Sequence, residues 1–147
     1  MKNGMWIDIT GYPIESKKII SYLEDNIAGA HVLFLGTVRS SGSKEGEVKS
    51  IVYECYEDLS KKRLVGIGDE IKSKWGVSRI VLVHRFGSLK LGEISVAVGV
   101  SAPHREEAFL ATRYGIECIK HALPIWKREI YKDCSSKWVR GVPLQKD

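Results

Sequence analysis

The chain has 147 residues, the usual size of one domain, and we expect residues 1–147 to fold as a single unit. Hydrophobic residues make up 44% and charged residues 28% of the sequence, which argues against a disordered or fibrous protein. The 23 lysines and arginines exceed the 18 aspartates and glutamates, which gives a net charge of +5. This modest excess favours an anionic ligand or partner, and the lack of long charge runs argues against binding to nucleic acid.

Three features of the sequence bear on the cellular compartment. Its apolar stretches are far shorter than the roughly 20 residues that cross a bilayer. The first residues, MKNGMWIDIT, lack the apolar core of a signal peptide. The cysteines, Cys55, Cys118 and Cys134, are odd in number and have no CxxC spacing. We therefore expect a cytoplasmic protein in a reducing compartment, without a membrane segment or a disulfide framework.

The first part of the chain alternates between predicted strands and one helix. Residues 6–10 are expected to form a strand, and the apolar residues of 15–27 keep to one face, which predicts an amphipathic helix. A β-rich strand over 30–39 leads into 40–46, a small and polar segment. This segment is either a mobile flap or a plain solvated connection. Residues 48–56 are expected to form the next strand.

The second part of the chain contains two further predicted helices. Apolar spacing marks one helix around residues 64–75 and another over 104–123, between Pro103 and Pro124. The expected strands are 79–86, 93–101, 125–132 and 137–139, with the loop GSLKLG between the first two. This order predicts an α+β domain in which three main helices pack on a mixed or mostly antiparallel sheet.

Common cofactor and catalytic motifs are missing from the sequence. It has no GxxxxGK[ST] or GxGxxG phosphate loop, no HExxH and no GxSxG. The four histidines do not fall at metal-ligand spacings, and His31 and His84, each alone on a strand, are expected to be core residues. We therefore expect no metal and no nucleotide cofactor.

The segment KHALPIWKRE places two lysines around a bend in the backbone. Lys120 falls in the last turn of a predicted helix, Pro124 ends that helix, and Lys127 follows on the next strand. Two ammonium groups held close together, and partly desolvated by Trp126, would have a lowered pKa and supply a neutral amine as base or nucleophile. The alternative is that Lys120 only complements the negative end of the helix dipole and that Lys127 is solvated.

Two other positions are suited to binding an anion. Arg39 ends a predicted strand, and His104 and Arg105 stand at the start of the third helix, where free amide groups favour negative charge. The alternative is that Arg105 pairs with a surface acid and that Arg39 is a solvated strand end.

Four sequence blocks follow one another along the chain: GAHVLFLGTVR (29–39), VHRFG (83–87), VGVSAPHREEAF (98–109) and IKHALPIWKRE (119–129). Together they resemble the large, catalytic subunit of molybdopterin synthase. The resemblance implies an α/β hammerhead fold and a homodimer within a heterotetramer, with a small ubiquitin-like sulfur-carrier subunit at each end. It also implies that the small subunit's C-terminal Gly-Gly thiocarboxylate delivers sulfur to cyclic pyranopterin monophosphate, giving molybdopterin, and that this subunit needs no cofactor.

The same resemblance assigns site residues. Lys120 and Lys127 match the family's two active-site lysines. Arg128 stands where many members have lysine, which changes the donor geometry beside Lys127, and whether Arg140 replaces another basic residue of the family stays open. The expected substrate-binding residues are Thr37, Val38, Arg39, His104, Arg105, Lys120, Lys127, Arg128 and Glu129.

Helix length adds a prediction about assembly. Arg105 and Lys120 are fifteen residues apart, or roughly 22 Å along an unbroken helix. Two groups so far apart cannot grip one small substrate. We therefore predict that one pocket combines Lys120 and Lys127 of one chain with Arg39, His104 and Arg105 of its dimer mate.

Two other functions remain open from the sequence alone. One is a sulfurtransferase that carries a persulfide on Cys118 or Cys134. The other is a non-catalytic module that recruits an acidic partner or RNA through its basic surface. Against RNA, the aromatic residues are not interleaved with basic ones as stacking platforms would be.

Overall fold

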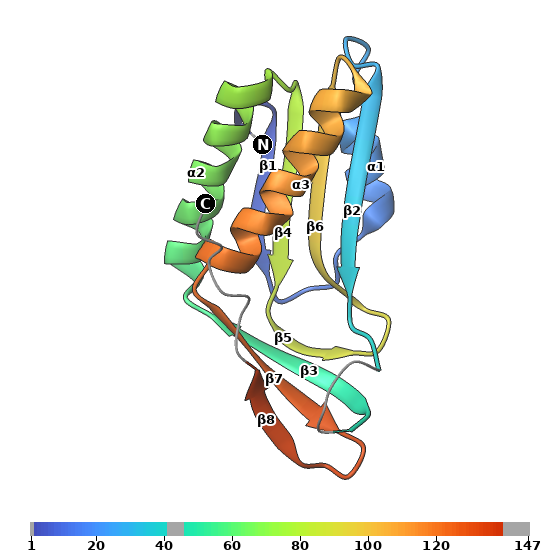
Figure 1. The fold of residues 1–147 in the computed structure, drawn as a ribbon, viewed down its shortest axis with the longest axis vertical. Helices are drawn as coiled ribbons and strands as arrows, with labels where there is room; N and C mark the ends of the chain where they lie inside the picture. The colour runs from blue at the N-terminus through green and yellow to red at the C-terminus, as the bar shows by residue number, and fades with distance from the viewer. Residues whose placement is uncertain (1, 41–45, 140–147) are drawn as a thin grey trace.

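The computed structural model describes residues 2–40 and 46–139, which form three α-helices and two four-stranded sheets (Figure 1). The first sheet has the strand order β1-β4-β6-β2, and the second has the order β5-β3-β7-β8. The helices are α1 (Ser16–Leu23), α2 (Glu57–Trp75) and α3 (Arg105–Ala122), with a short 3-10 helix at Lys2–Gly4. The strands are β1 (Met5–Thr10), β2 (Ala30–Thr37), β3 (Val48–Cys55), β4 (Arg79–Arg85), β5 (Gly87–Lys90), β6 (Ile94–Ala102), β7 (Ile125–Tyr131) and β8 (Ser136–Val139).

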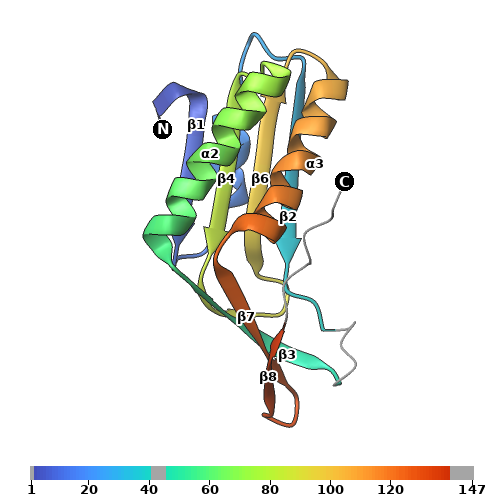
Figure 2. The ribbon, with the colours of Figure 1, turned by 60° about the vertical axis from the view of Figure 1, so that its left-hand side comes forward.

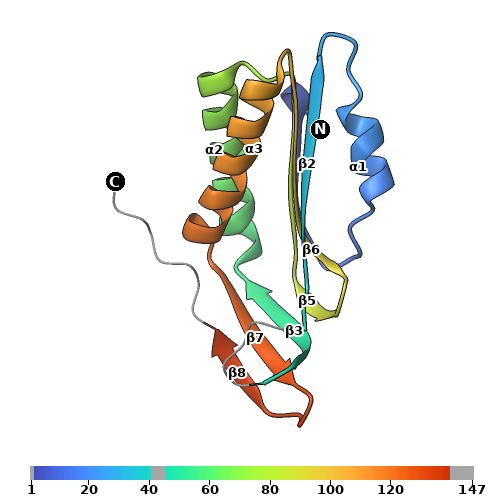
Figure 3. The same cartoon turned by 45° about the vertical axis from the view of Figure 1, so that its right-hand side comes forward.

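The first sheet is covered on both faces. Helices α2 and α3 lie on one face and α1 lies on the other (Figure 3). Strand β1 runs parallel to β4, while β4 and β2 both pair antiparallel with β6. Because β4 and β6 lie in the middle of this layer, nearly all their residues are buried, and their apolar side chains form the main core. The mixed sheet and the three helices are those expected from the sequence.

The second sheet projects from one end of the first, below α2 and α3 in Figure 2. All its strand pairs are antiparallel, and its own small core includes Ile51, Tyr53, Leu89 and Tyr131. Strand β5 lies where a loop was expected, over most of GSLKLG. It pairs with β3 and buries Leu89 completely. So short a sequence contains no local pattern that predicts either the pairing or the burial.

Several element ends differ from the expected ones. Helix α1 ends at Leu23 and leaves Ile27 76% exposed, so the predicted helix over 15–27 was too long. Helix α2 begins at Glu57, well before the apolar spacing shows it, with two acidic residues in a first turn that favours negative charge. Strand β2 ends at Thr37, which leaves Arg39 just beyond the sheet. Most of the segment 40–46, and Arg140, lie outside the described residues.

None of the helices in the described part of the chain is both long and apolar enough to cross a lipid bilayer. Within residues 2–40 and 46–139, no group of three or more His, Cys, Asp and Glu side chains is placed to hold a metal ion.

Candidate active site

The two lysines of the α3–β7 corner, here called the lysine pair, lie close enough to affect each other. Lys120 is in the last turn of α3 and Lys127 is the third residue of β7. Desolvation by the surrounding protein lowers the pKa of Lys120, and the positive charge of Lys127 lowers that pKa further. The Lys120 side chain as a whole stays exposed, so its desolvation is partial and solutes can reach it.

The lysine pair has no acidic partner among residues 2–40 and 46–139. Neither lysine forms an ion pair with a carboxylate of the described chain. Lys127 is half-buried, and not freely solvated as the simpler interpretation required. Two cations therefore face each other without a counter-charge, as expected of a site that receives an anion.

Tyr53 and His84 form the floor beneath the lysine pair. Tyr53 lies directly opposite Lys127 in the β3–β7 ladder, so both side chains point to the same face. The Tyr53 ring meets the His84 ring edge-on, with 5.2 Å between centroids and 71° between planes. Both residues are buried, with exposed fractions of 7% and 4%.

His84 is a neutral imidazole. Its Nδ1 lies 2.8 Å from the carbonyl oxygen of Arg85, and because a carbonyl only accepts, the proton is assigned to Nδ1. Burial lowers the pKa of His84 to about 4, and the nearby charge of Lys120 also lowers it. His84 therefore lies near Lys120 without adding a third positive charge at neutral pH.

The backbone just before Arg39 is held by the turn that precedes β6. The Val38 amide donates to the carbonyl of Glu93 at 3.1 Å, and the Gly92 amide donates to the carbonyl of Val38 at 2.8 Å. Val38 itself is 4% exposed, its side chain packs in the core and its amide already donates to Glu93, so neither is free to bind a ligand. Thr37, the last residue of β2, and Arg39 are both exposed.

His104 and Arg105 lie at the other end of α3. Both are exposed, and they line a cavity of about 490 Å³ with Gly29, Pro103 and Glu106. Arg105 forms no ion pair with an acid of the described chain, so the expected alternative of a surface ion pair is not seen. Figure 1 shows this end of α3 at the opposite end of the helix from the lysine pair.

Strand alternation separates the other expected residues of β7. Glu129 shares a face with Lys127 and accepts a hydrogen bond of 3.1 Å from the Tyr131 hydroxyl. Arg128 lies on the opposite face, with its guanidinium 5.7 Å from the centre of the Trp138 ring. The structure therefore brings Lys120 and Lys127 together, places Glu129 on the same face of β7 as Lys127, and directs Arg128 to the other face.

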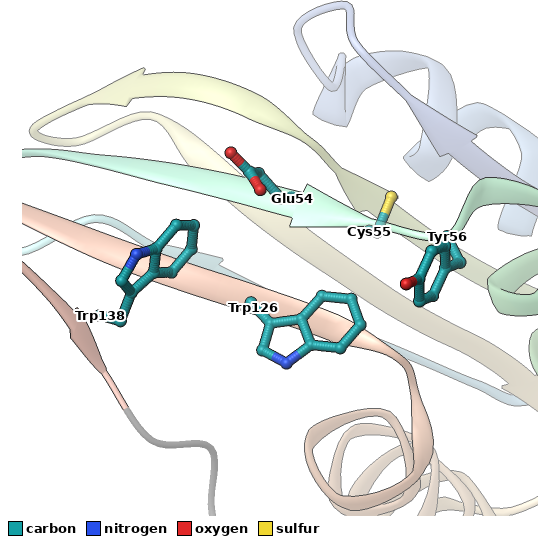
Figure 4. A pocket seen from close by; sticks show the side chains of 5 residues that line it. All are labelled: Glu54, Cys55, Tyr56, Trp126 and Trp138. Atoms are coloured by element: carbon teal, nitrogen blue, oxygen red, sulfur yellow. The ribbon is translucent and has the colours of Figure 1, made fainter.

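Trp126 also lies on the outer face of β7, although it was expected to help desolvate the lysines. Its ring is 47% exposed and meets Tyr56 edge-on at 5.3 Å. It lines an open groove of about 390 Å³ with Glu54, Cys55, Tyr56 and Trp138 (Figure 4). Successive side chains of β7 point to opposite faces of the sheet, so Trp126, which pairs with Glu54, points away from Lys127, which pairs with Tyr53.

His84 and Tyr53 are the site residues that sequence reasoning missed. His84 was expected to be a core residue and is buried, but its contact with the lysine pair has no local signal. In the sequence, only the place of His84 within the VHRFG block pointed to a role in the site. His31, also expected in the core, is instead exposed on the edge strand β2, with Nδ1 3.0 Å from the Ser101 hydroxyl.

The cysteines are poor candidates for carrying sulfur. Burial raises the pKa of both the Cys55 and the Cys118 thiol, which keeps them protonated and weakly nucleophilic. Cys134 is exposed in the turn between β7 and β8, on an arm of the second sheet.

Comparison with known proteins fits this architecture. The MoaE protein family matches residues 9–122, which is most of the chain. This chain belongs to the MoaE family. It is 41% identical to the molybdopterin synthase catalytic subunit of Bacillus subtilis over 132 residues, 90% of this chain and 83% of the relative. It is 40% identical to that of Staphylococcus aureus (strain COL), over 89% of this chain and 87% of the relative.

Solved structures agree with the MoaE assignment. The crystal structure of molybdopterin synthase from Staphylococcus aureus matches with a TM-score of 0.85 and 38% identity, over 95% of this chain and 98% of that one. A complex of subunits 1 and 2 of molybdopterin-converting factor from Helicobacter pylori shares the fold, with a TM-score of 0.72 and 21% identity over 92% and 90% of the two chains. MoaE membership confirms the resemblance and places this enzyme in molybdenum cofactor biosynthesis.

Proposed function

We propose that this MoaE chain transfers sulfur from the thiocarboxylated C-terminus of a small ubiquitin-like subunit to cyclic pyranopterin monophosphate, forming molybdopterin. The observation that carries the proposal is the lysine pair: two amines to which the described part of the chain offers no carboxylate partner, with the pKa of Lys120 lowered. Both proposed reactants bear negative charge, so the site fits their chemistry.

The two lysines take different roles in this proposal. Because its pKa is lowered, Lys120 gives up a proton more readily than an ordinary lysine, so the proton transfers as sulfur adds and the phosphate ester opens are assigned to it. Lys127 is assigned to the negative charge that develops on the acyl oxygen. For each sulfur delivered, water replaces it on the acyl carbon, and the small subunit's tail leaves as a carboxylate.

The substrate phosphate is assigned to Arg39, His104 and Arg105 of a second chain. Arg105 is separated from Lys120 by nearly the whole of α3, roughly 22 Å, so one chain cannot present both groups to one substrate. In the described part of the chain β2 pairs only with β6, and its free edge carries Phe34, 39% exposed. A free strand edge with an apolar side chain suits pairing with a second copy.

We also propose that the dimer binds one small subunit at each end, as a heterotetramer in the cytoplasm. The Helicobacter pylori neighbour is itself described as a complex of two subunits, which supports a small partner for this chain. The free thiols of Cys55, Cys118 and Cys134 are compatible with this compartment, which is reducing.

A reconstituted reaction tests the proposed function. The purified chain is mixed with thiocarboxylated small subunit and cyclic pyranopterin monophosphate, and the dithiolene product is assayed. The matched control is the same small subunit ending in an ordinary carboxylate, which should give no product. Product that forms equally well with the control would refute the proposal.

Variants separate this proposal from the two alternatives. A chain with all three cysteines replaced by serine should stay active, whereas a persulfide carrier would lose activity. Lys120→Ala and Lys127→Ala should lose turnover while still binding the small subunit, which a non-catalytic module cannot explain. Lys62→Ala, an exposed lysine on α2, is the control for loss of one positive charge.

A further inference from the structure

Tyr53 joins the two sheets of the molecule. It belongs to β3 of the second sheet, and its ring contacts His84 on β4 of the first sheet, at 5.2 Å between centroids. Its hydroxyl hydrogen-bonds with the side chain of Ser95 on β6. The Ser95 hydroxyl in turn donates to the carbonyl of Gly36 on β2, at 3.2 Å. A single buried side chain thus contacts two strands of the first sheet and is linked through Ser95 to a third.

The lysine pair spans this contact between the sheets. Lys127 lies opposite Tyr53 in the β3–β7 ladder and therefore moves with the second sheet. Lys120 belongs to α3, whose buried face packs on the first sheet. The distance between the two amines therefore depends on how the second sheet is held against the first.

We propose that Tyr53, held by His84 and Ser95, is a positioning residue that fixes the separation of Lys120 and Lys127. Repulsion between two like charges falls with their distance, so a looser contact between the sheets weakens the effect of Lys127 on Lys120. The catalytic consequence rests on the proposed function; the effect on the geometry does not.

The groups around Tyr53 keep this contact uncharged. His84 faces it from β4 as a neutral imidazole, and Ser95 faces it from β6. Burial raises the pKa of the Tyr53 hydroxyl, and the charge of Glu129 on β7 raises it as well. Tyr53 therefore remains a neutral spacer beneath the amines and does not neutralise them.

The test is an NMR titration of the free protein labelled with [ε-¹³C]lysine, with the Lys120 signal assigned from Lys120→Arg. Tyr53→Phe removes only the hydroxyl and Ser95→Ala removes the same hydrogen bond from the other side. Each should raise the pKa of Lys120 by about half a unit or more. Ser95→Ala also removes the bond to the Gly36 carbonyl, so the double variant should raise the pKa no further than Ser95→Ala alone, in which the bond to Tyr53 is already lost.

Tyr22→Phe is the matched control. The Tyr22 hydroxyl is also buried, but it lies on α1, across the first sheet from α3, and its loss should leave the Lys120 titration unchanged. An unchanged Lys120 pKa in folded Tyr53→Phe and Ser95→Ala would overturn the proposal. Should Tyr53→Phe fail to fold, Ser95→Ala alone decides.

Turnover separates this proposal from the proposed function. Tyr53→Phe should lower kcat about tenfold with little change in the KM for the small subunit, because the amines are misplaced and the docking surface is intact. A shifted titration with unchanged kcat would support the positioning role and refute the catalytic role of the lysine pair. A lowered kcat without a shifted titration would overturn the positioning role.

Discussion

Arg85, at the end of β4, and Glu93, just before β6, form an ion pair with 2.8 Å between Nη1 and Oε2. The other carboxylate oxygen of Glu93 accepts from the Lys90 amide at 2.8 Å, and its main-chain carbonyl accepts from Val38. The Lys90 amide and the Arg85 guanidinium hold the pKa of the Glu93 carboxyl below its usual range, and the Lys90 amide has the larger effect. One acidic residue thus fixes the turn that holds the backbone just before Arg39.

Removing this carboxylate should weaken the fold and the anion site together. Glu93→Ala leaves the largely buried Arg85 guanidinium without its partner, so the midpoint of urea unfolding should fall. The KM for the phosphate-bearing substrate should rise several-fold, because the turn that contacts Val38, next to Arg39, loses the carboxylate contacts to Arg85 and the Lys90 amide. In a double-mutant cycle, adding Arg85→Ala should cost far less than in the wild-type chain; fully additive losses would contradict the pairing.

The buried imidazole of His84 should make the fold sensitive to mild acid. Its pKa in the folded chain is about 4, against 6.5 for the free group, so the unfolded chain binds this proton more readily. Stability should therefore be complete above pH 6.5 and fall as the pH drops toward 4, by up to about 3 kcal/mol.

Urea unfolding at pH 7 and at pH 4.5 measures this loss, with His84→Gln as the comparison. The variant starts from a lower stability but lacks the titrating ring, so its stability should change less between the two pH values. An equal change in both proteins would show that His84 is not the group responsible.

The lysine pair should respond differently to charge-conserving changes. Lys120→Arg keeps a positive charge but cannot release a proton, so turnover should fall about 100-fold or more. Lys127→Arg keeps the cation that its proposed role requires and should retain much more activity. Loss of small-subunit binding in Lys120→Arg, measured by calorimetry, would instead point to a docking role.

The pH dependence of turnover should reveal the mutual effect of the two amines. Activity should rise with pH as Lys120 loses its proton, since only the neutral amine accepts one. In Lys127→Gln the neighbouring charge is gone, so the pKa of Lys120 should rise and the remaining activity should appear at higher pH. If activity rose at the same pH in both proteins, deprotonation of Lys120 would not be the cause of that rise.

A site shared between two chains predicts complementation. Lys120→Ala and Arg105→Ala should each be inactive alone. After random exchange of subunits, half of the dimers are mixed, and one pocket of each mixed dimer is intact, so about a quarter of wild-type activity should return. If each pocket lay within one chain, every chain would carry a lesion and mixing would restore nothing.

The reverse mixture is the control for complementation. A chain that carries both Lys120→Ala and Arg105→Ala is mixed with an equal amount of wild-type chain. Both pockets of every mixed dimer then lack one required residue and are inactive. Activity should then fall to about a quarter of that of the unmixed wild type, against about a half for pockets within single chains.

Much of this molecule follows from local sequence. Pro103 and Pro124 set the ends of α3, and the length of that helix alone separates Arg105 from Lys120. The same corner places Lys120 and Lys127 on either side of one bend. These features depend on residues that are near each other in the chain, so periodicity and backbone restrictions report them directly.

Tertiary structure decided the surroundings of that corner. The register of β3 against β7 places Tyr53 beside Lys127 and turns Trp126 and Arg128 outward. The packing of α3 on the first sheet places Lys120 near His84, and pairing with β3 makes β5 a strand. Pairing between segments distant in the chain depends on which surfaces bury each other, and a single strand does not carry that information.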